Sequence, residues 1–215
     1  MKFTESMKEY KPLIPPIDKP FIDMSKAEAQ AYFDWYISHV DERAEYLKTK
    51  VAEKLQIPLN KLDYSLESLK LIWKWFLGVA EISRISKKEI QHLKKSLKDY
   101  PQSFIDSMIG DSHEGLSIFT QFVLRDIGMY VGKVFTTNYP SIKWTFKTTP
   151  KNYISVNEPL LVGFVDSNPS YPKPFYPDLE PIGFAEGCAV KLISKTEHEN
   201  DLYDICNKWI QWIPK

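Results

Sequence analysis

The sequence predicts an α+β fold, with a mostly helical core and a small antiparallel sheet in the C-terminal half. Two observations predict it. Apolar residues recur at helical spacing through long segments before Pro140, and the spacing changes to alternation after it. No internal repeat and no clean boundary divides the chain. We therefore expect a single domain spanning residues 1–215.

Residues 1–24 contain four prolines, and apolar residues lie between them. Proline restricts the backbone and removes a hydrogen-bond donor, so regular structure is not expected here. A free tail would not need the apolar residues. We therefore expect an extended arm that lies against the body of the protein.

The first long helix is expected at 26–56. Ser25 and Glu28 have the spacing of a capping box, which marks a helix start. Apolar residues then follow at intervals of three and four, as expected for one buried stripe, and Pro58 ends the segment. The stripe consists of Phe33, Ile37, Val40, Ala44, Leu47 and Val51.

A second helix is expected at 65–80. It is apolar almost all round, which is typical of a helix in the core. Ser86 and Glu89 repeat the capping-box spacing and predict a short charged helix that ends near residue 99.

The segment 114–138 predicts a central helix, because apolar side chains cover well over half of its circumference. Gly128 and Gly132 lie one turn apart, so another backbone could approach closely there. Asp126 falls inside the apolar arc, where an isolated charge would be very costly. Two interpretations follow. Asp126 is paired structurally, with Tyr130, Lys133 or another element, or it is a polar anchor at the floor of a pocket.

After Pro140 the pattern indicates strands. Residues 142–147 alternate between apolar and polar, and 160–165 form a continuous apolar run, so we expect a small antiparallel sheet. Five prolines in 166–181 exclude regular structure there. Two helices, near 182–194 and 200–212, are expected to close the chain.

The charge balance argues against a nucleic-acid partner. The chain has 28 basic and 28 acidic residues, and only Arg43, Arg84 and Arg125 are arginine. Nucleic-acid binders gain much of their affinity from basic residues that neutralise phosphates. The N-terminus lacks the apolar core of a signal peptide, and no apolar tract is long enough to span a membrane. We expect a cytoplasmic protein without membrane association.

No motif in the chain indicates catalysis. The sequence lacks a nucleophile elbow, a Cys-x-x-Cys pair, a His-Glu-x-x-His pair and a phosphate-binding glycine loop. The four histidines have no metal-ligand spacing. Cys188 and Cys206 lie among apolar neighbours and are expected to be free, buried thiols. We expect no cofactor and no bound metal, and we consider an enzyme less favoured than a binding protein.

Three segments carry a resemblance: Asp126–Gly132, then Trp144, then Asn157–Phe164. Together they resemble a pattern in small bacterial proteins, some of which are similar to immunity proteins that neutralise a partner toxin. The resemblance covers about forty residues and implies a mostly helical protein with a small sheet. It carries over no site residues.

Two functions remain open at this point. The first is a non-catalytic protein-binding module, for example one of the immunity type. It would use Tyr171, Phe175 and Tyr176 of the proline-stiffened loop 166–181 as interface anchors. The alternative interpretation of that loop is a cover for the sheet. The second function is a small-molecule binder or enzyme, in which Asp126, Tyr130 and Trp144 line a pocket. The oligomeric state is not determined by the sequence.

Overall fold

The computed structural model describes residues 9–17, 19–84, 91, 114–168, 170 and 172–214. Within these ranges the chain is α+β, as predicted, with mostly helical structure and two small antiparallel sheets. The helices are α2 (Lys26–Leu55), α3 (Ser68–Leu77), α6 (Ile118–Asn138), α7 (Pro181–Ala189), α8 (Lys191–Ser194) and α9 (Asp201–Ile210). Two 3₁₀ turns, η1 (Phe21–Asp23) and η2 (Leu59–Lys61), precede and follow α2.

Helix α2 begins with the predicted capping box. The Ser25 hydroxyl accepts from the backbone N–H of Glu28, and the Glu28 carboxylate accepts from that of Ser25. The predicted stripe is correct from Val40 to Val51, but in the first half Tyr32 and Tyr36 are buried, one residue before Phe33 and Ile37. The phase differs because the N-terminal arm packs against that half, where the rings of Phe21 and Tyr32 lie 4.9 Å apart.

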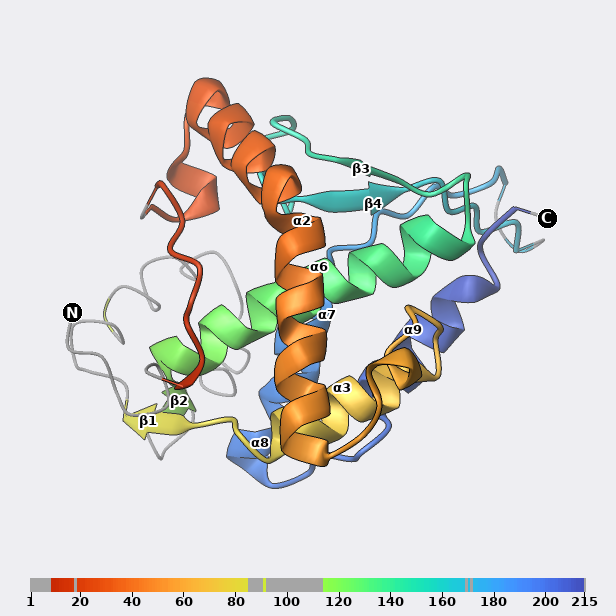
Figure 1. Cartoon of the computed structure of the whole chain (residues 1–215). Coiled ribbons are helices and arrows are strands. Elements are labelled where there is room, and N and C mark those ends of the chain that lie inside the picture. The colour runs from red at the N-terminus through yellow and green to blue at the C-terminus, as the bar shows by residue number, and fades with distance from the viewer. Residues whose placement is uncertain are drawn as a thin grey trace.

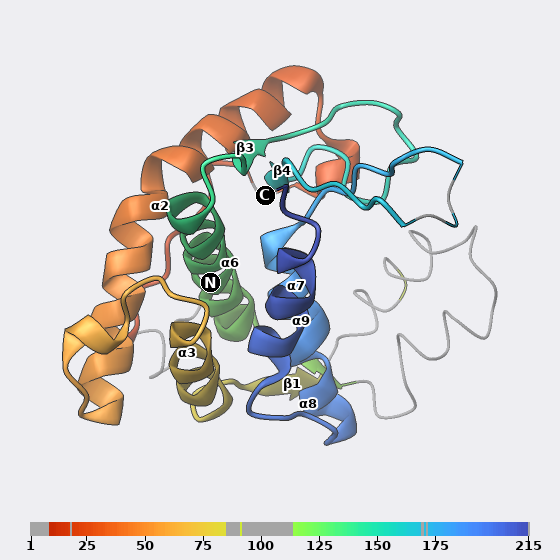
Figure 2. The ribbon, with the colours of Figure 1, turned by 90° about the vertical axis from the view of Figure 1, so that its right-hand side faces the viewer.

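Helix α6 is the central element. It crosses α2 and runs beside α7 (Figures 1 and 2). The close backbone approach predicted at the glycines occurs at Gly128, where an added Cβ would lie 3.0 Å from the backbone nitrogen of Ile182 in α7. At Gly132 the neighbour is the indole of Trp144.

The predicted 114–138 helix begins later than expected. Strand β2 (Glu114–Leu116) pairs with β1 (Ile82–Arg84), and the Ser117 hydroxyl then caps α6. This sheet was missed because its two strands are three residues each and lie far apart in the sequence. The predicted 86–99 helix lies outside the described residues.

The predicted sheet within 142–165 is confirmed. Strand β3 (Lys143–Thr145) pairs antiparallel with β4 (Leu160–Val162), and Trp144 lies opposite Leu161. Leu179 bridges to Leu161, so the chain returns beside β4 before it enters α7. The two predicted closing helices correspond to α7 with α8, and to α9.

The described part of the arm lies against the body, as expected. Tyr10 and Met24 are buried. Arg125 of α6 donates from Nη1 to the Leu13 carbonyl at 3.2 Å, and the Asn157 amide donates to the Phe21 carbonyl at 2.7 Å. Side chains of the body therefore hold the arm through its backbone oxygens.

Cys188 and Cys206 are free thiols, and both are buried. Burial raises the pKa of Cys188 to about 11 and also raises that of Cys206. None of the helices in the described part of the chain has the length and apolar character needed to cross a membrane.

Candidate functional site

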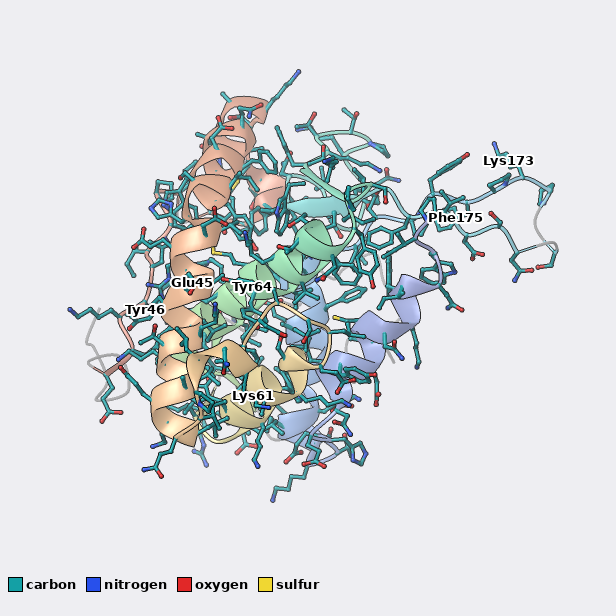
Figure 3. All side chains as sticks on the ribbon, turned by 45° about the vertical axis from the view of Figure 1, so that its right-hand side comes forward. Glu45, Tyr46, Lys61, Tyr64, Lys173 and Phe175 are labelled. Atoms are coloured by element: carbon teal, nitrogen blue, oxygen red, sulfur yellow. The ribbon has the colours of Figure 1, made fainter. Side chains whose placement is uncertain are left out.

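The loop 166–176 projects from the body of the protein. Figure 3 shows its residues Lys173 and Phe175 well away from Glu45, Tyr46 and Tyr64 on the main body. Two backbone hydrogen bonds close the loop. Asp166 N donates to Phe175 O at 2.8 Å, and Phe175 N donates to Asp166 O at 2.9 Å. The loop therefore has a fixed base.

Two aromatic side chains of this loop are exposed. Phe175 is 58% exposed and Tyr176 is 66% exposed. Tyr171, the third predicted anchor, lies outside the described residues. An aromatic ring in water loses the free energy that burial would provide. This pair is consequently available for contact with another molecule.

The base of the loop is fastened to the C-terminal segment and to the sheet region. Val165 N donates to the carbonyl of Trp212 at 2.7 Å. Asp178 accepts hydrogen bonds from Lys147 and, at 2.8 Å, from the Tyr153 hydroxyl. An open depression of about 760 Å³ lies at this base and includes Asp166 and Trp212 in its lining. The loop thus projects from a base that hydrogen bonds hold to the body of the protein.

Asp126 lies in a buried charged network. Arg43 of α2 donates to both carboxylate oxygens, from Nε at 3.1 Å and from Nη2 at 2.5 Å. The Tyr10 hydroxyl donates to Oδ2 at 2.5 Å. Arg43 also donates to the Lys11 carbonyl at 3.0 Å, and its guanidinium lies 4.3 Å from the centre of the Tyr46 ring. The network joins the arm, α2 and α6.

Burial and charge act against each other in this network. Burial raises the pKa of Asp126, and the hydrogen bonds and charge of Arg43 lower it. Burial would lower the pKa of Arg43, but the hydrogen bond and charge of Asp126 raise it overall. Burial and the Asp126 charge raise the pKa of Tyr10 well above its ordinary value. The geometry is that of an ionised pair with a neutral tyrosine.

The three residues of the predicted pocket each have different polar or aromatic partners in the structure. Tyr130 is buried and its hydroxyl lies 2.7 Å from Ser68 Oγ. Trp144 packs against Gly132 and meets the Tyr36 ring edge-on at 5.5 Å. Asp126 does not pair with either of the candidates on its own helix, because Tyr130 bonds to Ser68 and Lys133 pairs with Asp41. The partners come from other elements instead.

One group of carboxylates was not predicted from the sequence. Glu158, Glu180 and Glu186 influence one another at the start of α7. Burial, followed by the charge of Glu180, raises the pKa of Glu158 to about 9. The packed surroundings and then the Glu180 charge raise the pKa of Glu186 to about 7, although part of this side chain is exposed. Only Glu180 had a sequence signal, because it precedes a proline at a helix start.

Among the residues that the structure describes, no set of three or more His, Cys, Asp or Glu side chains is arranged to hold a metal ion. His39 Nδ1 lies 2.7 Å from the Trp35 carbonyl on its own helix.

Comparison with known protein families, with curated proteins and with solved structures finds no match to this chain.

Proposed function

We propose that this chain is a non-catalytic protein-binding module that contacts its partner through the loop 166–176. One observation carries the proposal: Phe175 and Tyr176 are exposed on a loop that projects from the body (Figure 3). Aromatic residues are enriched among the side chains that dominate the free energy of protein interfaces.

The construction of the loop favours binding. Its ends are joined by the Asp166–Phe175 backbone pair, and Pro172, Pro174 and Pro177 restrict the backbone beside the two rings. A restrained loop loses less conformational entropy when it binds. The alternative role, a cover for the sheet, would require rings that lie against the sheet. Exposures of 58% and 66% do not support that role.

The proposal includes a cytoplasmic location, which two free buried thiols support because such thiols are usual in reducing compartments. The resemblance of Asp126–Gly132, Trp144 and Asn157–Phe164 to immunity-type proteins suggests a toxin as the partner. Co-expression with toxins encoded beside this chain's gene would test that choice: rescue of growth would support it, and continued toxicity would refute it.

A photo-crosslinking amino acid placed at residue 175, in the organism that produces the protein, tests the loop directly. The matched control carries the same group at Leu59, which is 45% exposed in η2. We expect one discrete crosslinked protein from position 175 and none from position 59. In the double variant Phe175→Ala/Tyr176→Ala, capture of the identified protein should fall at least tenfold while the melting temperature stays within about 2 °C.

A large fall in the melting temperature would show that the loop is structural cover. Equal crosslinking from positions 175 and 59, or unchanged capture by the double variant, would refute the proposed interface.

A further inference from the structure

The depression at the base of the loop 166–176 presents one charge. Its volume is about 760 Å³, and the loop and the C-terminal segment line it together. Trp212 and Ile213 contribute to its apolar lining. Among the described lining residues, Asp166 is the only charged one. A carboxylate therefore lies beside apolar and neutral polar groups in one open cavity.

The Asp166 carboxylate has no cationic partner in the described part of the chain. No lysine or arginine nitrogen there, that of Lys173 on the same loop included, lies within 4.0 Å of it. The nearby Asp178, in contrast, pairs with Lys147. Asp166 Oδ1 accepts a hydrogen bond from the backbone N–H of Asn168 at 3.0 Å, which orients the carboxylate. The charge of Asp166 is therefore held in position and is not neutralised.

Phe175 lies opposite Asp166 across the base of the loop. The two residues exchange both backbone hydrogen bonds, at 2.8 and 2.9 Å, as an antiparallel pair. Side chains of directly opposed residues in such a pair point to the same face, with Cβ atoms about 4.5–5.5 Å apart. The exposed ring of Phe175, which Figure 3 shows on the projecting loop, thus borders the carboxylate.

Trp212 adds a second aromatic ring to the same depression. The hydrogen bond from Val165 N to the Trp212 carbonyl, 2.7 Å long, holds the C-terminal segment beside the residue that precedes Asp166. The rings of Trp209 and Trp212 meet at 79° with their centres 4.9 Å apart, so a neighbour supports the Trp212 indole. Trp212 is only partly buried. The depression therefore combines a supported aromatic surface with an unpaired carboxylate.

We propose that this depression receives an arginine side chain of the partner protein, which stacks on Trp212 and pairs with Asp166. This assignment rests on the proposed function of the loop and adds the chemistry of the partner. A planar guanidinium can stack on an aromatic ring while it donates hydrogen bonds to a carboxylate. Arginine, like tryptophan and tyrosine, is enriched among the residues that dominate interface free energy.

Other side chains match the depression less well. An acidic side chain would face the charge of Asp166, and an apolar one would displace water from that carboxylate without replacing its hydrogen bonds. Lysine carries the right charge, but its ammonium is compact, strongly hydrated and unable to stack as a plane. The charge of Asp166 and the rings of Phe175 and Trp212 together favour arginine.

Nuclear magnetic resonance of the full chain tests the cavity without the partner. The probe is N-acetyl-arginine methylamide, and the readout is the signal of the Trp212 indole N–H. We expect a saturable shift with a dissociation constant in the millimolar range, since one side chain supplies only part of an interface. The matched probe N-acetyl-citrulline methylamide has nearly the same shape without the charge, and it should bind at least about tenfold more weakly. N-acetyl-lysine methylamide should also bind more weakly than arginine.

Asp166→Asn removes the charge and keeps the shape of the side chain. Its amide oxygen can still accept from the Asn168 N–H, so the turn should persist. Binding of the arginine probe should fall at least about tenfold, because a charge-assisted pair is lost. The matched control Asp34→Asn removes an exposed carboxylate on α2 and should bind like the unaltered chain. If Asp166→Asn alters the loop, the comparison of arginine with citrulline on the unaltered chain still decides.

The same position tests the contact with the whole partner. Once a protein has been crosslinked from position 175, Asp166→Asn should weaken its capture at least about tenfold. Asp166→Arg should abolish capture, because it places like charges together. Replacement of one arginine of the partner by aspartate should then restore capture by Asp166→Arg, and that restoration identifies the arginine.

Three results would overturn the arginine site: no saturable shift of the Trp212 signal, equal binding of arginine and citrulline, or unchanged binding in Asp166→Asn. Binding of lysine as tight as that of arginine would overturn it too. Each of these results leaves the interface in place if position 175 still crosslinks to one discrete protein. Absence of that crosslink is the distinct outcome that refutes the proposed function itself.

Discussion

Asp126 joins three parts of the chain through one carboxylate. Its partners, Arg43 and Tyr10, are 83 and 116 residues away in sequence. The whole Asp126 residue is 0% exposed. Its carboxylate can therefore stay charged only because both carboxylate oxygens accept hydrogen bonds. The sequence predicted that Asp126 needs a partner, and the structure identifies the partner as an arginine from α2.

We expect Asp126→Ala to lower the free energy of unfolding by about 3–5 kcal/mol, because Arg43 would remain buried without its counter-charge. The matched variant Asp34→Ala removes an exposed aspartate from the N-terminal third of α2 and should cost no more than about 0.5 kcal/mol. Urea denaturation followed by circular dichroism measures both. Equal costs for the two variants would show that the Asp126–Arg43 pair does not stabilise the fold.

At the scale of the elements, the contact between α6 and α7 depends on a missing side chain. At Gly128 an added Cβ would lie 2.8 Å from Ile182 Cγ1 and 3.1 Å from Ile182 Cα. The neighbour is largely backbone, so it can yield only if the two helices separate. Gly187 of α7, in contrast, has no atom within 4 Å of its Cβ position.

Gly128→Ala should therefore destabilise the protein by about 1–3 kcal/mol, even though alanine favours a helix more than glycine does. Gly187→Ala should stabilise it by about 0.5–1 kcal/mol, since it gains helix propensity without a collision. Thermal and urea melts of both variants provide the measurement. Stabilisation by Gly128→Ala would mean that the two helices are packed less closely than described.

For the whole molecule, the carboxylates near α7 set a pH dependence of stability. The pKa of Glu158 is about 9 in the folded protein against an ordinary 4.5, and that of Glu186 is about 7. The folded state thus retains protons that the unfolded state has lost. Stability from these groups is full below about pH 4.5 and falls as pH rises towards 9.

Accordingly, the free energy of unfolding should decrease between pH 7 and 9, with a slope of up to about 1.4 kcal/mol per pH unit for the proton that Glu158 retains. Glu158→Gln should flatten this slope, because glutamine does not titrate, while Glu199→Gln should leave it unchanged. Urea melts at half-unit pH intervals measure it. A slope that survives in Glu158→Gln would assign the effect to other groups.

The sequence by itself determined the elements whose signals are local. The capping box at Ser25, the apolar period of α2 and α6, and the change to alternation after Pro140 placed the main helices and the β3–β4 sheet. These signals suffice because a helix cap and an apolar period are each formed by residues close in sequence. The aromatic residues of the 166–181 loop were likewise found by composition.

Tertiary structure alone decided which distant residues meet. Arg43 reaches Asp126 because α2 packs against α6, and Glu158 comes near Glu180 because the chain returns beside β4 at the Leu161–Leu179 bridge. It also decided the short β1–β2 sheet and the exposure of Phe175, neither of which a local pattern encodes. The physical reason is that periodicity specifies which face of an element is buried, whereas the partner on that face depends on how the helices cross.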